Sequence, residues 1–272
     1  MKKVCHMTSA HPSSDIRIFN KECVTLSRAG YKVFLAAHGE EYTEQGVSVQ
    51  SVGQAYSSRM KRMLFASRNI YRKALEIDAD IYHFHDPELL PYALKKKKKG
   101  KYVVYDSHED VPRQILAKTW IPKPIRKLVS KCYERYEKHA ARQFDYVITA
   151  TDHIKEIFEK YGCRAESVKN YPLLDDIQCN NDNYLSRPPI LCYAGGITEQ
   201  RGITNILRAI EDLNVKLDMA GDIETGYRKE LESMEGWKCV NYLGYLDRSG
   251  INKLYNKSRV GLVVLKDTPN HR

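Results

Sequence analysis

The chain has 272 residues, of which 42% are hydrophobic and 29% charged, and its formal net charge is +10 at pH 7; this composition excludes collagen-like, disordered and disulfide-stapled proteins. No apolar run approaches the roughly 18 residues that cross a bilayer, and the first residues lack the apolar stretch of a secretory signal. The seven cysteines are scattered without a C-x-x-C pair, which indicates reduced residues of a cytoplasmic protein, with neither bridges nor a zinc site.

Runs of β-branched and aromatic residues alternate with helical patterns through the first part of the chain. We expect strands at 2–8, 31–38, 47–53, 80–85, 101–108, 145–151 and 166–172. We expect helices at 17–29, 57–77, 87–99, 124–143 and 152–162, the last with Asp152 as its N-cap. Strands separated by helices require parallel pairing and right-handed crossovers.

A polar segment with paired prolines, 175–189, is the best candidate for a linker. After it the alternation restarts, with strands at 190–196, 215–221, 238–245 and 259–266 and helices at 202–212, 226–234 and 247–257. We therefore expect an α/β protein of two Rossmann-like domains, residues 1–172 and 189–272, joined by a linker at 173–188. The last strand, RVGLVVLK, is expected to be a buried parallel strand, and because few residues follow it we expect the second domain to be incomplete.

The charge is divided unevenly between the two parts. Residues 1–170 hold 31 Lys and Arg against 20 Asp and Glu, and residues 171–272 hold 13 against 14. The basic part predicts a phosphate-rich or anionic-membrane partner. The segment around 118–138 interleaves basic residues with apolar residues at helical spacing; the membrane candidates are Lys123, Arg126, Lys127 and Lys131, and the apolar residues are Ile125, Leu128, Val129, Cys132 and Tyr136. This pattern suits an anionic membrane surface and equally a core-packed helix with a basic outer face.

In open α/β sheets ligands bind outside the carboxyl ends of the strands. In the first domain that rule selects His85 and Asp86, then His108, and the first loop with Asp15 and Arg17. His83 and His85 share a face of their strand, so with Asp86 and His108 they are one possible zinc set. The alternative is one core histidine and one that lines a cleft, and we expect no metal.

In the second domain the same rule selects small residues at three strand ends. Gly195 and Gly196 allow backbone N–H groups to approach a phosphate at a helix N-terminus, and Arg201 is placed to pair with a diphosphate. The other strand ends carry Gly221, Asp222, Gly244 and Tyr245. A plain turn is the alternative for the glycine pair. Neither a dinucleotide fingerprint nor a P-loop is present.

Four segments in order carry a family resemblance: SAHPSSDIRIFNKE (9–22), DADIYHFHDPELL (78–90), YDSHED (105–110) and YAGGITEQRGI (193–203). Together they resemble bacterial family-four retaining glycosyltransferases of the GT-B fold, the type found in capsule, O-antigen and exopolysaccharide clusters. The similarity runs from Lys2 to about Leu265. It implies two Rossmann-like domains facing a cleft.

The resemblance also implies roles for the residues at the matching positions. His108 matches the histidine near the transferred sugar, and His85 and Asp86 match the strand end that holds the acceptor. The remaining matches face the donor: Asp15 and Arg17 in the first loop, Gly195, Gly196 and Arg201 at the diphosphate, and Gly221, Asp222, Gly244 and Tyr245 in the nucleotide pocket. The earlier Arg of the family's R-x-x-x-x-K-G pattern is replaced by Gly196. The family's motif of two glutamates separated by seven residues is missing, so we expect a chain truncated at its C-terminus.

The resemblance therefore implies a glycosyltransferase that moves a sugar from a nucleotide-diphosphate sugar to a glycan or lipid-linked acceptor. We expect no cofactor, no metal and no nucleic acid, and a cytoplasmic, peripheral position at the inner membrane face. Two alternatives remain: a non-catalytic remnant that binds a membrane or a partner, and a metal-dependent hydrolase using His83, His85 and His108.

Overall fold

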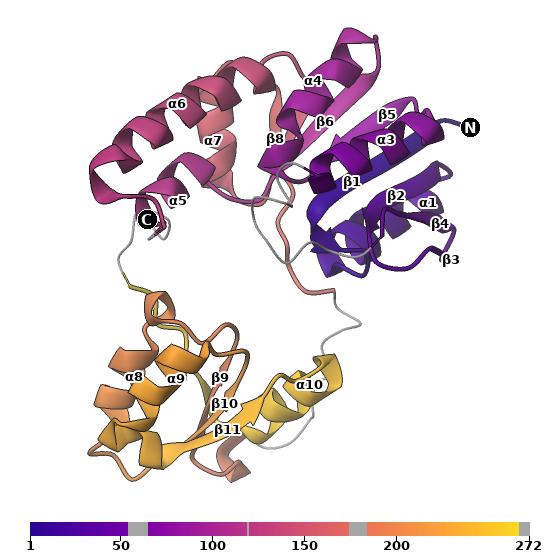
Figure 1. Cartoon of the computed structure of the whole chain (residues 1–272). Coiled ribbons are helices and arrows are strands. Elements are labelled where there is room, and N and C mark those ends of the chain that lie inside the picture. Colours follow the sequence, from indigo (N-terminus) through magenta and orange to yellow (C-terminus); the bar gives the residue numbers. More distant parts are fainter. Residues whose placement is uncertain (54–64, 119, 174–183, 267–272) are drawn as a thin grey trace. The chain divides into compact units, whose positions relative to one another are not determined.

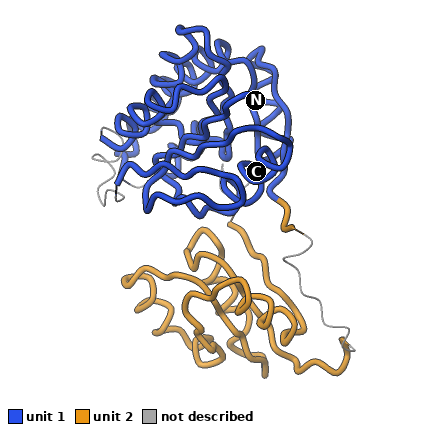
Figure 2. Tube along the Cα trace, turned by 90° about the vertical axis from the view of Figure 1, so that its right-hand side faces the viewer, with its two compact units in different colours: residues 1–170 blue, residues 171–272 orange. Residues whose placement is uncertain are grey.

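The computed structural model describes residues 1–53, 65–118, 120–173 and 184–266. The chain forms two compact units, residues 1–170 and 171–272 (Figure 2). Each unit contains one twisted sheet flanked by helices (Figure 1). The expected fold class, α/β with two separate and mainly parallel sheets, is confirmed.

The sheet of the first unit has eight strands in the order β3-β4-β2-β1-β5-β6-β7-β8. The strands are β1 (Lys3–Pro12), β2 (Lys32–His38), β3 (Tyr42–Glu44), β4 (Val47–Ser51), β5 (Ile81–Phe84), β6 (Tyr102–Ser107), β7 (Tyr146–Thr149) and β8 (Ala165–Ser167). All neighbours pair in parallel except β3, which turns back on β4. Because β1 has β2 on one side and β5 on the other, the strand order reverses there, which is where such folds bind ligands.

The connections of the first unit are mainly helical. They are η1 (Ile16–Cys23), α1 (Val24–Arg28), α3 (Ser67–Ile77), η3 (Pro87–Leu89), α4 (Leu90–Lys98), α5 (Val111–Ala117), α6 (Lys123–Ala141) and α7 (Asp152–Lys160). The local signals explain several ends: Pro87 and Pro91 stand in the first turns of η3 and α4, where a missing N–H costs nothing. Gly100 and Gly162, both with positive φ, follow α4 and α7.

Two apolar layers cover opposite faces of this sheet, because side chains alternate along each strand. The larger layer joins strand residues such as Tyr82 and Tyr105 to α3, α4, α6 and α7. The smaller one joins Val33 and Leu35 of β2 to η1 and α1. The sheet is therefore buried on both sides, as a parallel sheet requires.

The second unit has a four-stranded parallel sheet in the order β11-β10-β9-β12. Its elements are η5 (Tyr184–Ser186), β9 (Ile190–Ala194), η6 (Glu199–Arg201), α8 (Ile203–Ile210), β10 (Lys216–Ala220), α9 (Thr225–Glu232), η7 (Glu235–Cys239), β11 (Val240–Gly244), α10 (Arg248–Lys257) and β12 (Val260–Gly261). Its main core packs α8 against β9 and β10. Here β9 is the strand at which the order reverses.

Two expectations need correction, and two elements of the first unit were not expected. The short strand β3 and the helix α5 were not predicted; three residues of a hairpin and seven of a helix are too short for a clear period. The N-cap of α7 is Thr151, whose hydroxyl accepts from the N–H of Ile154, and Asp152 lies in the first turn. The segment 259–266 is not a buried strand: it pairs over two residues at an edge of the sheet, and Val263 is 83% exposed.

The predicted helix at 57–77 is described only from residue 65 on, and most of the predicted linker, 174–183, lies outside the described residues.

Candidate active site

Alternation along two neighbouring strands gathers three histidines on one face of the first sheet. β1 pairs with β5 with His6 opposite His83. Tyr82 and Phe84 fill the larger core, so His83 and His85 point to the other face. The three imidazole rings lie close together, with centroids 4.4–5.3 Å apart. A buried polar layer therefore stands where the smaller apolar layer ends.

The helix η1 supplies the charged partners of this layer. Its π-helical hydrogen bonds join residues five apart, which brings Arg17 and Glu22 to the same side. The Nε atom of Arg17 lies 3.1 Å from Glu22 Oε1. Asp15 is the N-cap, and its Oδ1 accepts from the N–H of Ile18 at 2.9 Å. η1 starts at Ile16, four residues after β1 ends at Pro12, so its first turn lies near the carboxyl end of β1.

Asp106, at the end of β6, connects these groups. Arg17 donates to both of its carboxylate oxygens, at 3.0 Å to Oδ1 and 3.2 Å to Oδ2. On the other side its Oδ2 lies 3.1 Å from His108 Nε2 and 3.3 Å from His85 Nδ1. The Asp106 and His85 side chains are fully buried, whereas His108 is 18% exposed. His108 is thus the outermost member of a buried chain that begins at Arg17.

Burial and pairing fix the protonation of this cluster. Burial alone would raise the pKa of Asp106, but hydrogen bonds from His108 and His85 hold that pKa well below its usual range. Burial lowers the pKa of His6 far below 6.5, that of His83 to about 3, and that of His85 as well. These three imidazoles are neutral at pH 7. Burial and the neighbouring Asp106 raise the pKa of Glu22 well above 4.5.

Asp86, two residues after β5, fixes the carboxyl-terminal part of β1. Its Oδ2 accepts from Thr8 Oγ1 at 2.8 Å and from the backbone N–H groups of Ser9 and Ala10 at 2.5 and 3.1 Å. Its Oδ1 lies 3.4 Å from His11 Nε2. Its side chain is 3% exposed, so Asp86 holds these residues in place from the interior of the unit.

In the second unit, glycines at adjacent strand ends allow close backbone contact. The N–H of Gly195 donates to Ala220 O at 3.0 Å, and the N–H of Gly221 donates to Gly244 O at 2.8 Å. A Cβ on Gly221 would lie 1.8 Å from Gly195 O, and φ is +143° there, so only glycine fits. The expected strand-end residues are therefore brought together, although the Gly195 amide is occupied within the protein. Asp222 and Tyr245 follow at the same edge, and Tyr245 is 76% exposed.

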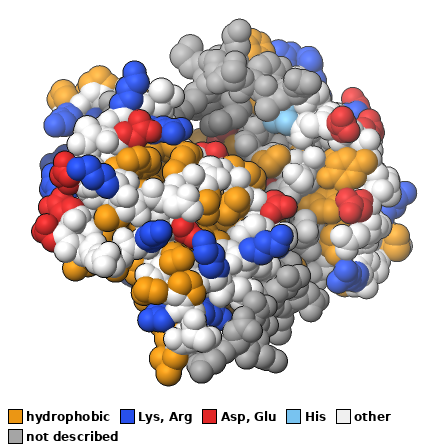
Figure 3. Space-filling view, turned by 90° about the horizontal axis from the view of Figure 1, so that it is seen from below, with side chains coloured by type: hydrophobic (Ala, Val, Ile, Leu, Met, Phe, Trp, Pro, Cys, Tyr) orange, Lys and Arg blue, Asp and Glu red, His pale blue; other side chains and the backbone are white. Residues whose placement is uncertain are grey.

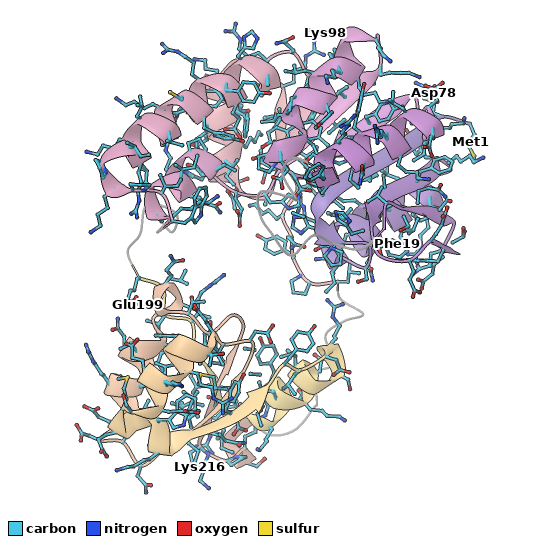
Figure 4. All side chains as sticks on the ribbon, in the orientation of Figure 1. Met1, Phe19, Asp78, Lys98, Glu199 and Lys216 are labelled. Carbon is cyan, nitrogen blue, oxygen red and sulfur yellow. The ribbon has the colours of Figure 1, made fainter. Side chains whose placement is uncertain are left out.

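A pocket of about 260 Å³ opens at this edge, between the ends of β9 and the chain after β12. It is lined by Tyr193, Ala194, Gly195, Gly196, Arg201 and the segment Leu262–Leu265. Figure 4 labels Glu199, beside Arg201, and Lys216, which starts β10, at opposite ends of the unit, so the pocket lies toward the carboxyl ends. Within the described residues the Arg201 guanidinium makes no hydrogen bond or ion pair, which leaves it available to an anion.

The helix α6 carries a surface that combines apolar and basic side chains. Its buried side consists of Ser130, Glu137, Ala140 and Ala141. The apolar residues expected at helical spacing, Ile125, Leu128, Val129, Cys132 and Tyr136, are exposed instead of packed in the core. Lys123, Lys127 and Lys131 flank them on the exposed side. We call this set the α6 surface.

Arg126 does not belong to the α6 surface. Its guanidinium donates to the carbonyls of Ile121 and Leu116 at 2.7 and 3.4 Å, which ties α6 to the preceding segment.

On the face of the molecule drawn in Figure 3, basic, acidic and hydrophobic side chains are interspersed. None of the described helices is long and apolar enough to pass through a bilayer.

The structure gives several predicted site residues a different environment from the one expected. Asp15 and Arg17, expected at the donor, are engaged inside the first unit, as a helix cap and as the partner of Asp106. His6, Glu22 and Asp106 were given no role from the sequence, although Asp106 stands at the same strand end as His108. The alternating segments CHM (5–7) and YHFH (82–85) contain the signal, since a histidine at every second position of a buried strand must meet a polar partner.

Comparisons with known proteins identify the family and the fold of the chain. Residues 22–170 match the family described as Glycosyltransferase Family 4. Sucrose-phosphate synthase from Thermosynechococcus elongatus superposes with a TM-score of 0.74 at 13% identity, over 99% of this chain and 77% of that one. WaaG, a glycosyltransferase involved in lipopolysaccharide biosynthesis, gives 0.69 at 13% identity, over 99% and 76%.

Trehalose 6-phosphate synthase from Burkholderia multivorans gives a TM-score of 0.65 at 13% identity, over 98% of this chain and 78% of that one. At these identities the superpositions show the fold alone, and that fold is the two-domain GT-B architecture. A comparison with curated protein sequences gave no match.

Proposed function

The chain belongs to glycosyltransferase family 4, a family of retaining enzymes, and from this premise we propose that it transfers a sugar from a nucleotide-diphosphate sugar to a glycan or lipid-linked acceptor of surface polysaccharide synthesis, at the inner face of the membrane. The observation that carries the proposal is the pocket at the end of β9. It combines glycine backbone with the unpaired guanidinium of Arg201, in front of α8.

The donor side of the proposal follows from the chemistry of the leaving group. A nucleoside diphosphate gains negative charge as the sugar leaves, and a guanidinium and a helix N-terminus both stabilise that charge. Arg201 is in η6, immediately before Gly202 and the first turn of α8. We assign Arg201, Gly195 and Gly196 to the diphosphate, and Gly221, Asp222, Gly244 and Tyr245 to the nucleotide.

The acceptor side of the proposal depends on His108. Its side chain is the partly exposed end of the Arg17–Asp106–His108 chain, so it can meet a sugar while Asp106 fixes its orientation. We assign His108 to the transferred sugar and the acceptor hydroxyl. His85 and Asp86 are buried, and we assign them to positioning: His85 supports His108, and Asp86 shapes the carboxyl-terminal part of β1.

The donor assignment is tested by nucleotide binding to the full chain. We expect one of UDP, GDP or ADP to bind, and Arg201→Ala to weaken that binding on the order of 10–100-fold, the cost of losing a charge-assisted hydrogen bond of about 1.5–3 kcal/mol. Arg208→Ala is the matched control, since Arg208 is an exposed arginine of the following helix, α8, and does not line the pocket. Equal binding by the wild type and Arg201→Ala would remove Arg201 from the donor site.

The membrane part of the proposal rests on the α6 surface. Exposed Leu128 (63%) and Ile125 (45%) beside a row of lysines form an interfacial helix face, which binds by apolar insertion together with charge attraction. Each lysine near an anionic surface contributes about 1 kcal/mol. Replacing Lys123, Lys127 and Lys131 by Gln should therefore weaken binding to phosphatidylglycerol-containing vesicles on the order of 100-fold at low salt.

A matched control separates this surface from general charge attraction. Lys95, Lys98 and Lys99 at the end of α4 are also exposed, but no large apolar residue of α4 is exposed beside them. Their triple Gln variant removes the same charge and should bind vesicles as the wild type does, whereas Leu128→Ser should weaken binding even at high salt. Equal losses in the two triple variants would contradict the assignment of α6.

A further inference from the structure

Four side chains from three elements converge under η1 in a way that the proposed sugar transfer does not use. They are His6 of β1, Glu22 of η1, His83 of β5 and His85, which directly follows β5. One potential ligand atom from each lies within 4.8 Å of the other three. We propose that these four residues bind a divalent transition-metal ion, with Zn²⁺ as the best match.

The spacing of the ligand atoms fits one ion. Glu22 Oε2 lies 3.8 Å from His6 Nδ1, 3.9 Å from His83 Nε2 and 3.8 Å from His85 Nε2. His6 Nδ1 and His85 Nε2 are 3.0 Å apart, a spacing that serves one hydrogen bond or two ligands of one ion. A tetrahedral zinc with bonds of about 2.0–2.2 Å holds its ligand atoms about 3.3–3.5 Å apart. Closing the site would shorten the 3.8–3.9 Å separations by about 0.3–0.6 Å and lengthen the 3.0 Å separation by a similar amount.

Several of these buried atoms also need a partner. Glu22 Oε2 and His83 Nε2 are buried and form no hydrogen bond with any residue in the described part of the chain. A buried polar atom without a partner costs about 1–3 kcal/mol. These two atoms point to the common centre, where one ion would satisfy both of them.

The charge of the surroundings favours a cation. The carboxylates of Glu22 and Asp106 share the single guanidinium of Arg17, at 3.1 and 3.0 Å. A cation between the four ligand atoms would add a second positive charge beside these two carboxyl groups. Three imidazoles and one carboxylate form a ligand set that zinc accepts, and they leave no position for a fifth protein ligand.

This set differs from the one weighed from the sequence. Asp86 is not a member, because its carboxylate already accepts hydrogen bonds from Thr8, Ser9 and Ala10 of β1. A second group, His85, Asp106 and His108, also has suitable spacing. Arg17 already occupies both oxygens of Asp106, which makes that group the poorer ligand set. The ion at the proposed site would join η1 to β1 and β5, and it would support His108 only through His85.

Metal binding itself tests the site, without reference to transfer activity. Full-length protein without a histidine tag is stripped by a chelator, checked for its fold by circular dichroism, and titrated with Zn²⁺ against a chromophoric chelator. We expect one ion per chain. We expect Glu22→Gln and His83→Asn each to raise the Kd by at least about 100-fold, since loss of even an outer partner of a ligand costs about 10–100-fold.

Two histidine variants serve as controls. His153→Ala removes an exposed histidine of α7 and should bind Zn²⁺ as the wild type does. His108→Ala should also keep its ion, because His108 lies outside the four ligands. If His83→Asn fails to fold, Glu22→Gln decides, since it changes one atom. The proposal is overturned if the wild type binds less than one ion, if Glu22→Gln keeps wild-type affinity, or if His108→Ala loses the ion.

Discussion

The buried carboxyl of Glu137 should make the stability of the first unit depend on pH. Glu137 is on the sheet side of α6, opposite the α6 surface, and accepts hydrogen bonds from the hydroxyls of Tyr105 and Tyr133 at 3.1 and 3.4 Å. Burial raises the pKa of Glu137 from 4.5 to about 7. The protonated form is therefore favoured in the folded protein.

The direction of this pH dependence follows from how many protons the folded and unfolded states bind. Between pH 4.5 and about 7 the folded state holds a proton that the unfolded state has released, so stability falls as pH rises through this range. At about 1.36 kcal/mol per pKa unit, the whole contribution is roughly 3 kcal/mol; it is complete below pH 4.5 and lost above pH 7. Glu137→Gln keeps the shape and an acceptor but never ionises.

We therefore expect Glu137→Gln to match the wild type at pH 5 and to exceed it at pH 8 by roughly 2–3 kcal/mol. For a unit of this size that is about 5–10 °C in Tm, measured by circular dichroism at both pH values. Glu134→Gln is the control on the same helix. Burial alone would raise the pKa of Glu134, but its pairing with Arg113 lowers that pKa, so this variant should lose stability at pH 8. A Glu137→Gln protein no more stable than the wild type at pH 8 would refute the reasoning.

Three further outcomes follow from the contacts described. Arg17→Met leaves the buried Asp106 without its guanidinium and should lower the free energy of unfolding by about 3–5 kcal/mol in chemical denaturation. Adding Asp106→Asn should recover part of this loss. An unchanged denaturation midpoint in Arg17→Met would contradict the role of this pair. Gly221→Ala places a Cβ against Gly195 O and should lower the free energy of unfolding by about 3 kcal/mol or more, the upper range for single substitutions. Gly226→Ala is the control: Gly226 of α9 has open space around it, so this variant should change stability by less than about 1 kcal/mol. His108→Asn should abolish sugar transfer while nucleotide binding stays within about twofold of the wild type, and retained turnover would remove His108 from the site.

Much of the fold follows from the sequence because its signals are local. The strands at β5 and β6 and the helices α4 and α7 have clear apolar periods with proline or glycine at their ends, and the structure has each of them within a few residues of the expected bounds. The glycines of three separate strand ends were also expected to meet, since carboxyl ends of parallel strands share one edge. Family membership and the GT-B fold were likewise expected from four segments and are confirmed.

What the sequence did not predict depends on partners far along the chain. Arg17 suits a phosphate as a sequence feature, and only the approach of Asp106, 89 residues later, shows that its guanidinium is engaged within the protein. The segment 259–266 is as apolar as a central strand, but its place at the sheet edge follows from the strand order, which local composition does not determine. The exposure of Leu128 likewise depends on which side of α6 meets the sheet.

The central claim is sugar transfer from a nucleotide-diphosphate donor bound at the end of β9. It is tested most directly by incubating the full chain with a panel of UDP-, GDP- and ADP-sugars and following the anomeric proton of the sugar by NMR. The account predicts release of the nucleoside diphosphate, a first-formed product with the anomeric configuration of the donor, and loss of turnover in Arg201→Ala but not in Arg208→Ala. An inverted product, or turnover equal in the two variants, would contradict it.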